Sequence, residues 1–228
     1  MKKLTAASGI AIAAVALGLT LAGCGSDTKT EATTTEATSE TTTEAAPTTS
    51  AQAAGGNYTI VDYIKDNGIV ETPVKRGDPG SPTINLPFPP GWEDAGPRTP
   101  QWAWSMLVYT DPAMSNNPPT ITAIVSKLTG NVDPAKILEF APGELKNLPE
   151  FAGEGGGSTS TLGGFEAYQI GGSYMRDGVK HMIAQKTVVI PGQDGLYVLQ
   201  LNADGLEDQM GPLMEATAAI DERTTITA

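Results

Sequence analysis

The only histidine of the chain, His181, is the first residue to weigh as a catalytic group. Ser173 or Tyr174 would face it across a hairpin centred on Arg176-Asp177-Gly178. A Ser-His pair could begin a nucleophilic site, but neither a Gly-x-Ser-x-Gly elbow nor an oxyanion motif accompanies it. We therefore expect an ordinary strand histidine, no catalytic residue, and a protein that is not an enzyme.

The chain lacks the residues that a metal site or a phosphate-binding site needs. One His and one Cys leave little for a zinc site, and the acidic residues do not follow the Asp-x-Asp-x-Asp-Gly spacing of a calcium loop. The Gly153–Gly157 run (GEGGG) lacks the Lys-Ser/Thr of a P-loop and precedes a strand instead of a helix. We expect a flexible loop there, no metal and no cofactor.

Aromatic residues gather in one segment, which is the one feature typical of a ligand site. Trp92, Trp102 and Trp104 are all the tryptophans of the chain, and Tyr109 follows them. Such residues line many apolar grooves, so the four are our candidate ligand-binding residues. The alternative is core packing, with Trp102 and Trp104 on one face of a strand. Core packing is the favoured interpretation.

The only cysteine, Cys24, predicts a lipid anchor. Positive Met1–Lys3 and uncharged Leu4–Ala22 have the pattern of a secretory signal, and it ends in the lipobox Leu21-Ala22-Gly23-Cys24. Diacylglycerylation and cleavage would remove residues 1–23 and leave Cys24 lipidated, each buried methylene adding about 0.8 kcal/mol of membrane affinity. An uncleaved membrane helix is the alternative, but the lipobox followed by a polar tract favours lipidation.

Residues 24–56 predict a lipidated cysteine followed by a disordered stalk. Of the 29 residues from 26 to 54, 14 are Ser or Thr and none is Val, Ile, Leu, Met or aromatic. Such a segment buries too little apolar surface to fold. The remaining residues 57–228 are long enough for one globular domain with its own core.

The net charge limits the partners. With 26 acidic against 14 basic side chains, the net charge is −12, which gives no electrostatic footprint for nucleic acid. The same charge repels anionic membrane surfaces, so the membrane is expected as a partner only through Cys24. We expect the domain on the extracytoplasmic side of the cell membrane.

The elements that would position these residues alternate between helix and strand patterns. Thr59 predicts a helix N-cap, Asp133-Pro134 a second helix start with a kink at Pro142-Gly143, and the last helix is expected over about 206–220. Strands are expected around 82–87 and over 105–110, 120–128, 165–174, 179–190 and 196–202. Hairpin turns join the later strands, so the pattern predicts an α+β fold with a central, mostly antiparallel sheet flanked by helices.

Several stretches of the chain, NYTIVDYIKDNGI, GDPGSPTINLP, SKLTGNVDPAKILEFAPGELKNLP, QKTVVIP and LQLNAD, resemble the mycobacterial LpqN/LpqT lipoproteins. The run from Ser126 to Pro149 is the most specific. The resemblance implies a Mog1/PsbP-like α/β/α sandwich and a role in cell-envelope biogenesis, beside the machinery that moves trehalose-linked mycolates outward. It supplies no catalytic motif.

Two functions from different classes follow. The first is a non-catalytic accessory in envelope lipid (trehalose mycolate) transport, which docks an envelope lipid transporter or binds a trehalose glycolipid, or does both. It predicts an apolar groove. The alternative is a protein-interaction module of the cell surface, with an envelope or host partner and no lipid ligand. It predicts salt-sensitive partner binding.

Overall fold

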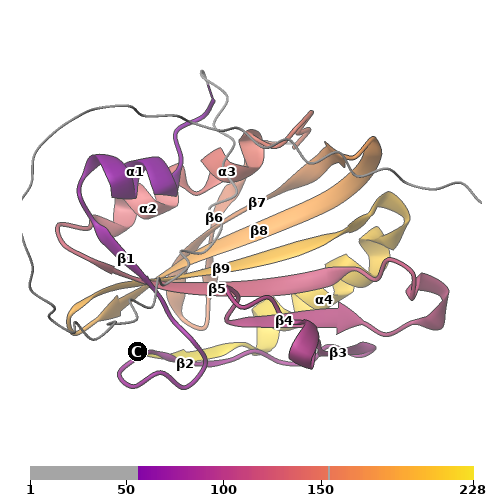
Figure 1. Ribbon diagram of the computed structural model, residues 1–228, viewed down its shortest axis with the longest axis horizontal. Coiled ribbons are helices and arrows are strands. Elements are labelled where there is room, and N and C mark those ends of the chain that lie inside the picture. The colour runs from indigo at the N-terminus through magenta and orange to yellow at the C-terminus, as the bar shows by residue number, and fades with distance from the viewer. Residues whose placement is uncertain (1–55, 154) are drawn as a thin grey trace, which may run out of the picture. The chain divides into compact units, whose positions relative to one another are not determined.

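A computed structural model describes residues 56–153 and 155–228 of the chain (Figure 1). The predicted signal peptide, Cys24 and nearly all of the stalk lie outside the described residues. An eight-stranded sheet with antiparallel pairing dominates the described part, in the order β3-β4-β5-β9-β8-β7-β6, with β1 also paired to β5. Its strands are β1 (Val70–Pro73), β3 (Trp92–Asp94), β4 (Ser105–Tyr109), β5 (Thr120–Thr129), β6 (Ser158–Leu162), β7 (Phe165–Arg176), β8 (Val179–Gly192) and β9 (Gly195–Leu206).

Helices cover both faces of this sheet, which confirms the α/β/α arrangement. The alternation of strand residues shows the two faces: Val189 and Val198 pack with the first helices, whereas Val188 and Leu199 pack with the last. Figure 1 shows α1, α2 and α3 grouped over one end of the sheet. The helices are α1 (Ile60–Asp66), α2 (Pro134–Phe140), α3 (Pro142–Lys146) and α4 (Met210–Arg223).

Local sequence signals account for most element boundaries. The Thr59 hydroxyl accepts from the backbone N–H of Asp62, whose carboxylate accepts from the backbone N–H of Thr59, a reciprocal helix cap. The Asp133 carboxylate accepts from the backbone N–H of Ala135 at the start of α2. Asp177 has a φ of 53° between β7 and β8, as the hairpin signal predicts. These predictions are confirmed.

The last helix begins four residues later than expected. β9 continues to Leu206, a 3-10 turn covers Glu207–Gln209, and α4 starts at Met210. The Gln209 side chain accepts from the backbone N–H of Leu206 at 2.8 Å, which stabilises the turn before the helix. This side-chain contact closes a turn that the apolar periodicity does not report.

The prediction that Trp102 and Trp104 share one face of a strand is wrong. Both precede β4, and Trp104 is buried whereas Trp102 is 37% exposed. Several short strands also lay beyond the sequence patterns, because they are largely exposed and polar: β1, β3, β6 and β10 (Thr225–Thr227). β10 pairs with β2 (Thr83–Asn85) in a separate two-stranded sheet.

Within the described residues, no helix combines the length and the apolar character needed to cross a membrane.

Candidate functional site

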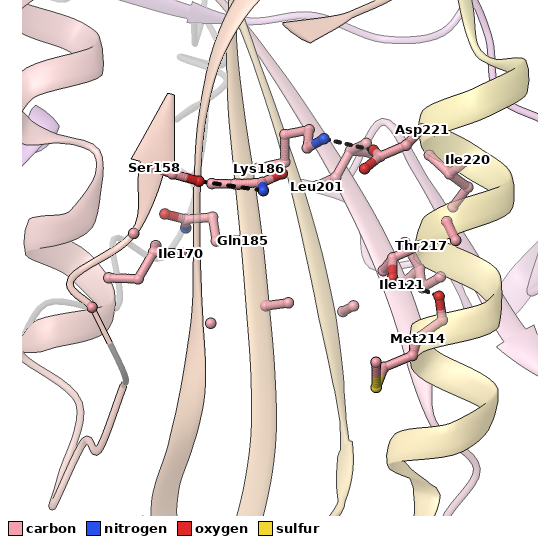
Figure 2. A pocket seen from close by; sticks show the side chains of 17 residues that line it. Ile121, Ser158, Ile170, Gln185, Lys186, Leu201, Met214, Thr217, Ile220 and Asp221 are labelled. Carbon is pink, nitrogen blue, oxygen red and sulfur yellow. Dashed lines mark hydrogen bonds and ion pairs between the residues drawn. The ribbon is translucent and has the colours of Figure 1, made fainter. Parts of the chain in front are cut away.

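A groove of about 520 Å³ lies between α4 and the sheet (Figure 2). Its floor comes from β5, β9, β8 and β7, one wall comes from α4, and the opposite wall comes from β6 and the glycine loop before it. It is lined by Ile121, Gly155, Gly157, Ser158, Gln169, Ile170, Gly171, Ala184, Gln185, Lys186, Leu201, Ala203, Met214, Thr217, Ala218, Ile220 and Asp221.

The groove is open because small residues stand where larger side chains would fill it. Gly171 on β7 and Ala184 on β8 are directly paired across the floor, and both are exposed. Ala218 is exposed on the facing wall. α4 is held to the sheet by other residues, of which Leu213, Ala216 and Ile220 are buried in the main core. The packing of α4 on the sheet through these residues therefore leaves the groove open beside it.

One end of the groove is polar. Lys186 is 8% exposed, and its ammonium lies 2.7 Å from the Asp221 carboxylate and donates to the Ser160 hydroxyl at 3.2 Å. Figure 2 shows this ion pair reaching from the sheet to α4. The Gln169 amide donates to the Ser158 hydroxyl at 3.4 Å on the neighbouring wall. This end thus offers hydrogen-bond donors and acceptors around a cation that is already paired.

The other end of the groove is apolar and opens past two methionines. Met210 and Met214, one helical turn apart on α4, are 45% and 62% exposed. A second cavity of about 190 Å³ adjoins here and also contains Met182 and Leu213 in its walls. The two cavities share five lining residues, Gly171, Ala184, Ala203, Met214 and Thr217. Together they form a site that is polar at one end and apolar at the other.

The aromatic candidates lie elsewhere. Trp92 and Trp104 are buried in the main core, with the Trp92 ring 5.4 Å from that of Tyr109 and the Arg76 guanidinium 4.6 Å from the Trp104 ring. Of these four candidates, Trp102 included and all among the described residues, none lines either cavity. A ligand-binding role for them stays a prediction. The groove itself has only a weak sequence signal, small residues on strands.

His181 does not meet a serine nucleophile. It is paired with Tyr174 across the hairpin, whereas Ser173 is paired with Met182 and so points to the other face. His181 is 4% exposed, and its Nδ1 lies 3.0 Å from Asp204 and 2.9 Å from the Arg176 guanidinium. The cluster therefore ties the strands β7, β8 and β9 together without forming a Ser-His pair.

Two further groups have shifted pKa values. Burial, together with donation of a 2.6 Å hydrogen bond to the Asp204 carboxylate, raises the pKa of Tyr174. Burial also raises the pKa of Glu144 on α3, although the Gln185 and Gln200 amides both donate to this carboxylate at 3.1 Å. Within the described part of the chain, no three His, Cys, Asp or Glu residues gather as a metal site.

Comparison with known proteins identifies the family. Residues 56–227 match the family described as probable lipoprotein LpqN. The chain is 58% identical to lipoprotein LpqN of Mycobacterium tuberculosis (strain ATCC 25618 / H37Rv), over the whole of both proteins. It is also similar to the crystal structure of LpqN involved in cell envelope biogenesis of Mycobacterium tuberculosis, with a TM-score of 0.73 and 60% identity over 76% of this chain and all of that one. This chain therefore belongs to the LpqN lipoprotein family.

Proposed function

We propose that this chain is a lipid-anchored lipoprotein of the mycobacterial cell envelope that binds an amphiphile in the groove beside α4. The observation that carries the proposal is the polarity of the groove, with the Lys186–Asp221 pair at one end and exposed methionines at the other. A ligand with a polar head and an alkyl chain matches both ends at once. The relative's description as involved in cell envelope biogenesis supports a role in that process.

A sugar is the proposed headgroup, and a trehalose glycolipid the proposed ligand. Because Lys186 is neutralised by Asp221, the polar end has paired charge and does not favour a phosphate over a neutral head. Hydroxyl groups can both donate to Asp221 and accept from Lys186 or the Gln169 amide. A disaccharide presents many such groups in a small volume.

The proposed role is accessory and non-catalytic. His181 and Ser173, the residues that could have begun a nucleophilic site, lie on opposite faces of the hairpin. The groove holds one ion pair and hydroxyl and amide groups, which suit binding and orientation of a ligand. The family is named for lipoproteins.

The predicted lipid anchor would hold the binding domain at the membrane. In the proposal, Cys24 carries the acyl groups, residues 24–56 form the stalk, and residues 57–228 form the binding domain on the extracytoplasmic side. The stalk would let the domain reach about 30 Å from the membrane, by the scaling of a flexible chain of 29 residues.

Docking to an envelope lipid transporter is the second proposed activity. The helices α1–α3 cover one end of their sheet face (Figure 1), and the other end presents part-exposed side chains of β5 and β9. Thr122 and Asn202, which are paired across the two strands, contribute a hydroxyl and an amide group there. Part-exposed polar groups of this kind suit a protein partner, with or without a bound lipid.

Native mass spectrometry tests the proposal. The full chain with Cys24→Ser, which lacks the acyl groups, is incubated with a trehalose monoester and, separately, with a phosphatidylglycerol of the same chain length. We expect one trehalose ester per chain and weak retention of the anionic lipid. Equal retention of both would overturn the sugar headgroup, and no adduct with either would leave the interaction module as the function.

A further inference from the structure

Glu144 on α3 is a carboxylate that two amides hold in place on the sheet face away from the groove. Its Oε2 atom accepts from the Gln185 and Gln200 side-chain amides, both at 3.1 Å. Among the described residues, no hydrogen bond or ion pair reaches its Oε1 atom, and this atom is not one of the fully buried atoms that lack a partner. Because an ionised carboxylate can only accept hydrogen bonds, Oε1 is an acceptor open to a donor from outside the domain.

Other carboxylates beside the sheet are paired with cations, whereas Glu144 is not. Asp221 lies 2.7 Å from the Lys186 ammonium, and Asp204 lies 3.3 Å from the Arg176 guanidinium. The charged group that acts on Glu144 is Glu71 on β1, a second carboxylate, which adds to the effect of burial in raising the pKa of Glu144. A partly buried negative charge without a cation is unfavourable, so a cation brought by a partner would stabilise it.

The Gln185 side chain beneath Glu144 also lacks a donor. Gln185 is 5% exposed, and its Nε2 donates to Glu144 at 3.1 Å and to the Asn202 Oδ1 at 3.0 Å. Its Oε1 is buried without a partner in the described part of the chain. Oε1 and Nε2 are bonded to one carbon, so the unpartnered oxygen belongs to the same cluster. Two acceptor oxygens without donors favour a ligand group that only donates, such as an ammonium or a guanidinium.

The surface between Glu144 and Glu71 suits the stem of a basic side chain. Ile124 on β5 is part-exposed and pairs with Gln200 on β9, next to Glu144. Two residues further along β5, the Ser126 hydroxyl donates to the Glu71 carboxylate at 2.7 Å and holds it in place. Ile124 therefore offers aliphatic surface to the methylene groups of an arginine or lysine. The helices α1–α3 group over the other end of this sheet face (Figure 1).

We infer that Glu144, with Glu71 beside it, binds an arginine or lysine side chain of a protein partner on the uncovered half of this sheet face. The inference rests on the docking activity proposed above and names the chemistry of the partner. The net charge of −12 fits a partner with a basic surface. A metal ion fits the site less well, because no three His, Cys, Asp or Glu residues gather within the described residues.

Photo-crosslinking in living mycobacteria tests the inference. The photoreactive p-benzoylphenylalanine replaces Thr122, which is part-exposed on β5 and paired with Asn202. We expect a crosslinked protein partner whose yield Glu144→Gln lowers about fivefold or more, because the variant keeps the size of the side chain and removes its charge. Glu215→Gln, the same change at an exposed glutamate on α4, is the matched control and should leave the yield unchanged within about twofold.

A small probe measures the preference for a positive charge directly. N-acetyl-arginine amide and its uncharged analogue N-acetyl-citrulline amide are titrated into the isotope-labelled Cys24→Ser full chain. NMR follows the side-chain amide signals of Gln185, Gln200 and Asn202. We expect the arginine compound to shift these signals and the citrulline compound to bind about fivefold more weakly or less. Glu144→Gln should remove this difference, and Glu215→Gln should keep it.

The outcomes separate the inference from the docking proposal. A partner crosslink that Glu144→Gln leaves unchanged, or equal binding of the arginine and citrulline compounds, overturns the basic side chain and leaves docking standing. A crosslink between two copies of this chain, or amide shifts with calcium chloride that exceed those with arginine, also overturns the inference. No crosslink at all overturns the docking proposal and the inference together.

Discussion

The aromatic region and the groove both present apolar side chains, yet the first is filled and the second is open. Trp92 and Trp104 are buried in the main core, where the Trp92 ring packs against Tyr109 and the Trp104 ring against the Arg76 guanidinium. In the groove, Gly171 and Ala184 are paired on the floor, Ala218 lies on the wall, and about 520 Å³ stays open. The comparison teaches that a cluster of large side chains marks a core, whereas a row of small ones can mark a binding site.

Truncating the core should have the largest effect. Trp92→Ala removes a buried ring from the main core, so we expect the free energy of unfolding to fall by about 3–5 kcal/mol. Groove binding by the molecules that remain folded should be unchanged, because Trp92 lines neither cavity. Urea unfolding measures the free energy of unfolding. Calorimetric titration with dodecyl β-maltoside, an amphiphile with a sugar head and one alkyl chain, measures binding in the groove.

Trp102→Ala is the control for that experiment. Since Trp102 is exposed and precedes β4, we expect a change within about 0.5 kcal/mol. A large loss of maltoside affinity in either tryptophan variant would contradict the separation of the two regions and revive the aromatic groove.

Filling the groove should give the opposite result. Ala218→Leu places a larger side chain on the groove wall, and leucine favours helix nearly as well as alanine. We expect maltoside affinity to fall at least tenfold, about 1.4 kcal/mol, with the melting temperature almost unchanged. Retained affinity in a folded Ala218→Leu chain would show that the ligand binds elsewhere.

The ion pair at the polar end should have a smaller effect. Lys186→Met removes both the buried cation and one donor, so we expect dodecyl maltoside to bind about two- to tenfold more weakly. Asp221→Asn leaves the buried Lys186 without its carboxylate, and we expect it to destabilise the fold more than Lys186→Met does. The order of the two melting temperatures checks this explanation.

Glu144 on the opposite sheet face should show the smallest effect on stability, and only as a dependence on pH. Burial raises the pKa of Glu144, so the folded chain holds this proton to a higher pH than the unfolded chain does. The contribution to stability therefore falls as the pH rises from the ordinary carboxyl value through the raised one. Relative to the parent chain, Glu144→Gln should be more favourable at pH 7 than at pH 4 in urea unfolding. An equal difference in unfolding free energy between Glu144→Gln and the parent chain at both pH values would contradict a raised pKa of Glu144 as the cause.

Local signals in the sequence were sufficient for much of the fold. The Thr59 cap, the Asp133-Pro134 helix start and the Asp177 hairpin each depend on residues within a few positions of one another, and the structure confirms all three. Short exposed strands such as β6 carry no such signal, because pairing with β7 holds them in place.

The candidate site was much less predictable. Trp104 is buried by contact with residues far along the chain, so its aromatic character could not tell a core from a groove. Gly171 and Ala184 become neighbours only through the pairing of β7 with β8, and α4 comes last in the chain to face them.

The sequence by itself determined the family and the order of the helices and longer strands, and it predicts the lipid anchor at Cys24, because each depends on a short motif or a local pattern. Only the tertiary structure decided where space remains unfilled. The size of the groove depends on the volumes of side chains that meet from separate strands and a helix. Its polar end depends on the ion pair between Lys186 on the sheet and Asp221 on α4, which only the folded chain brings together.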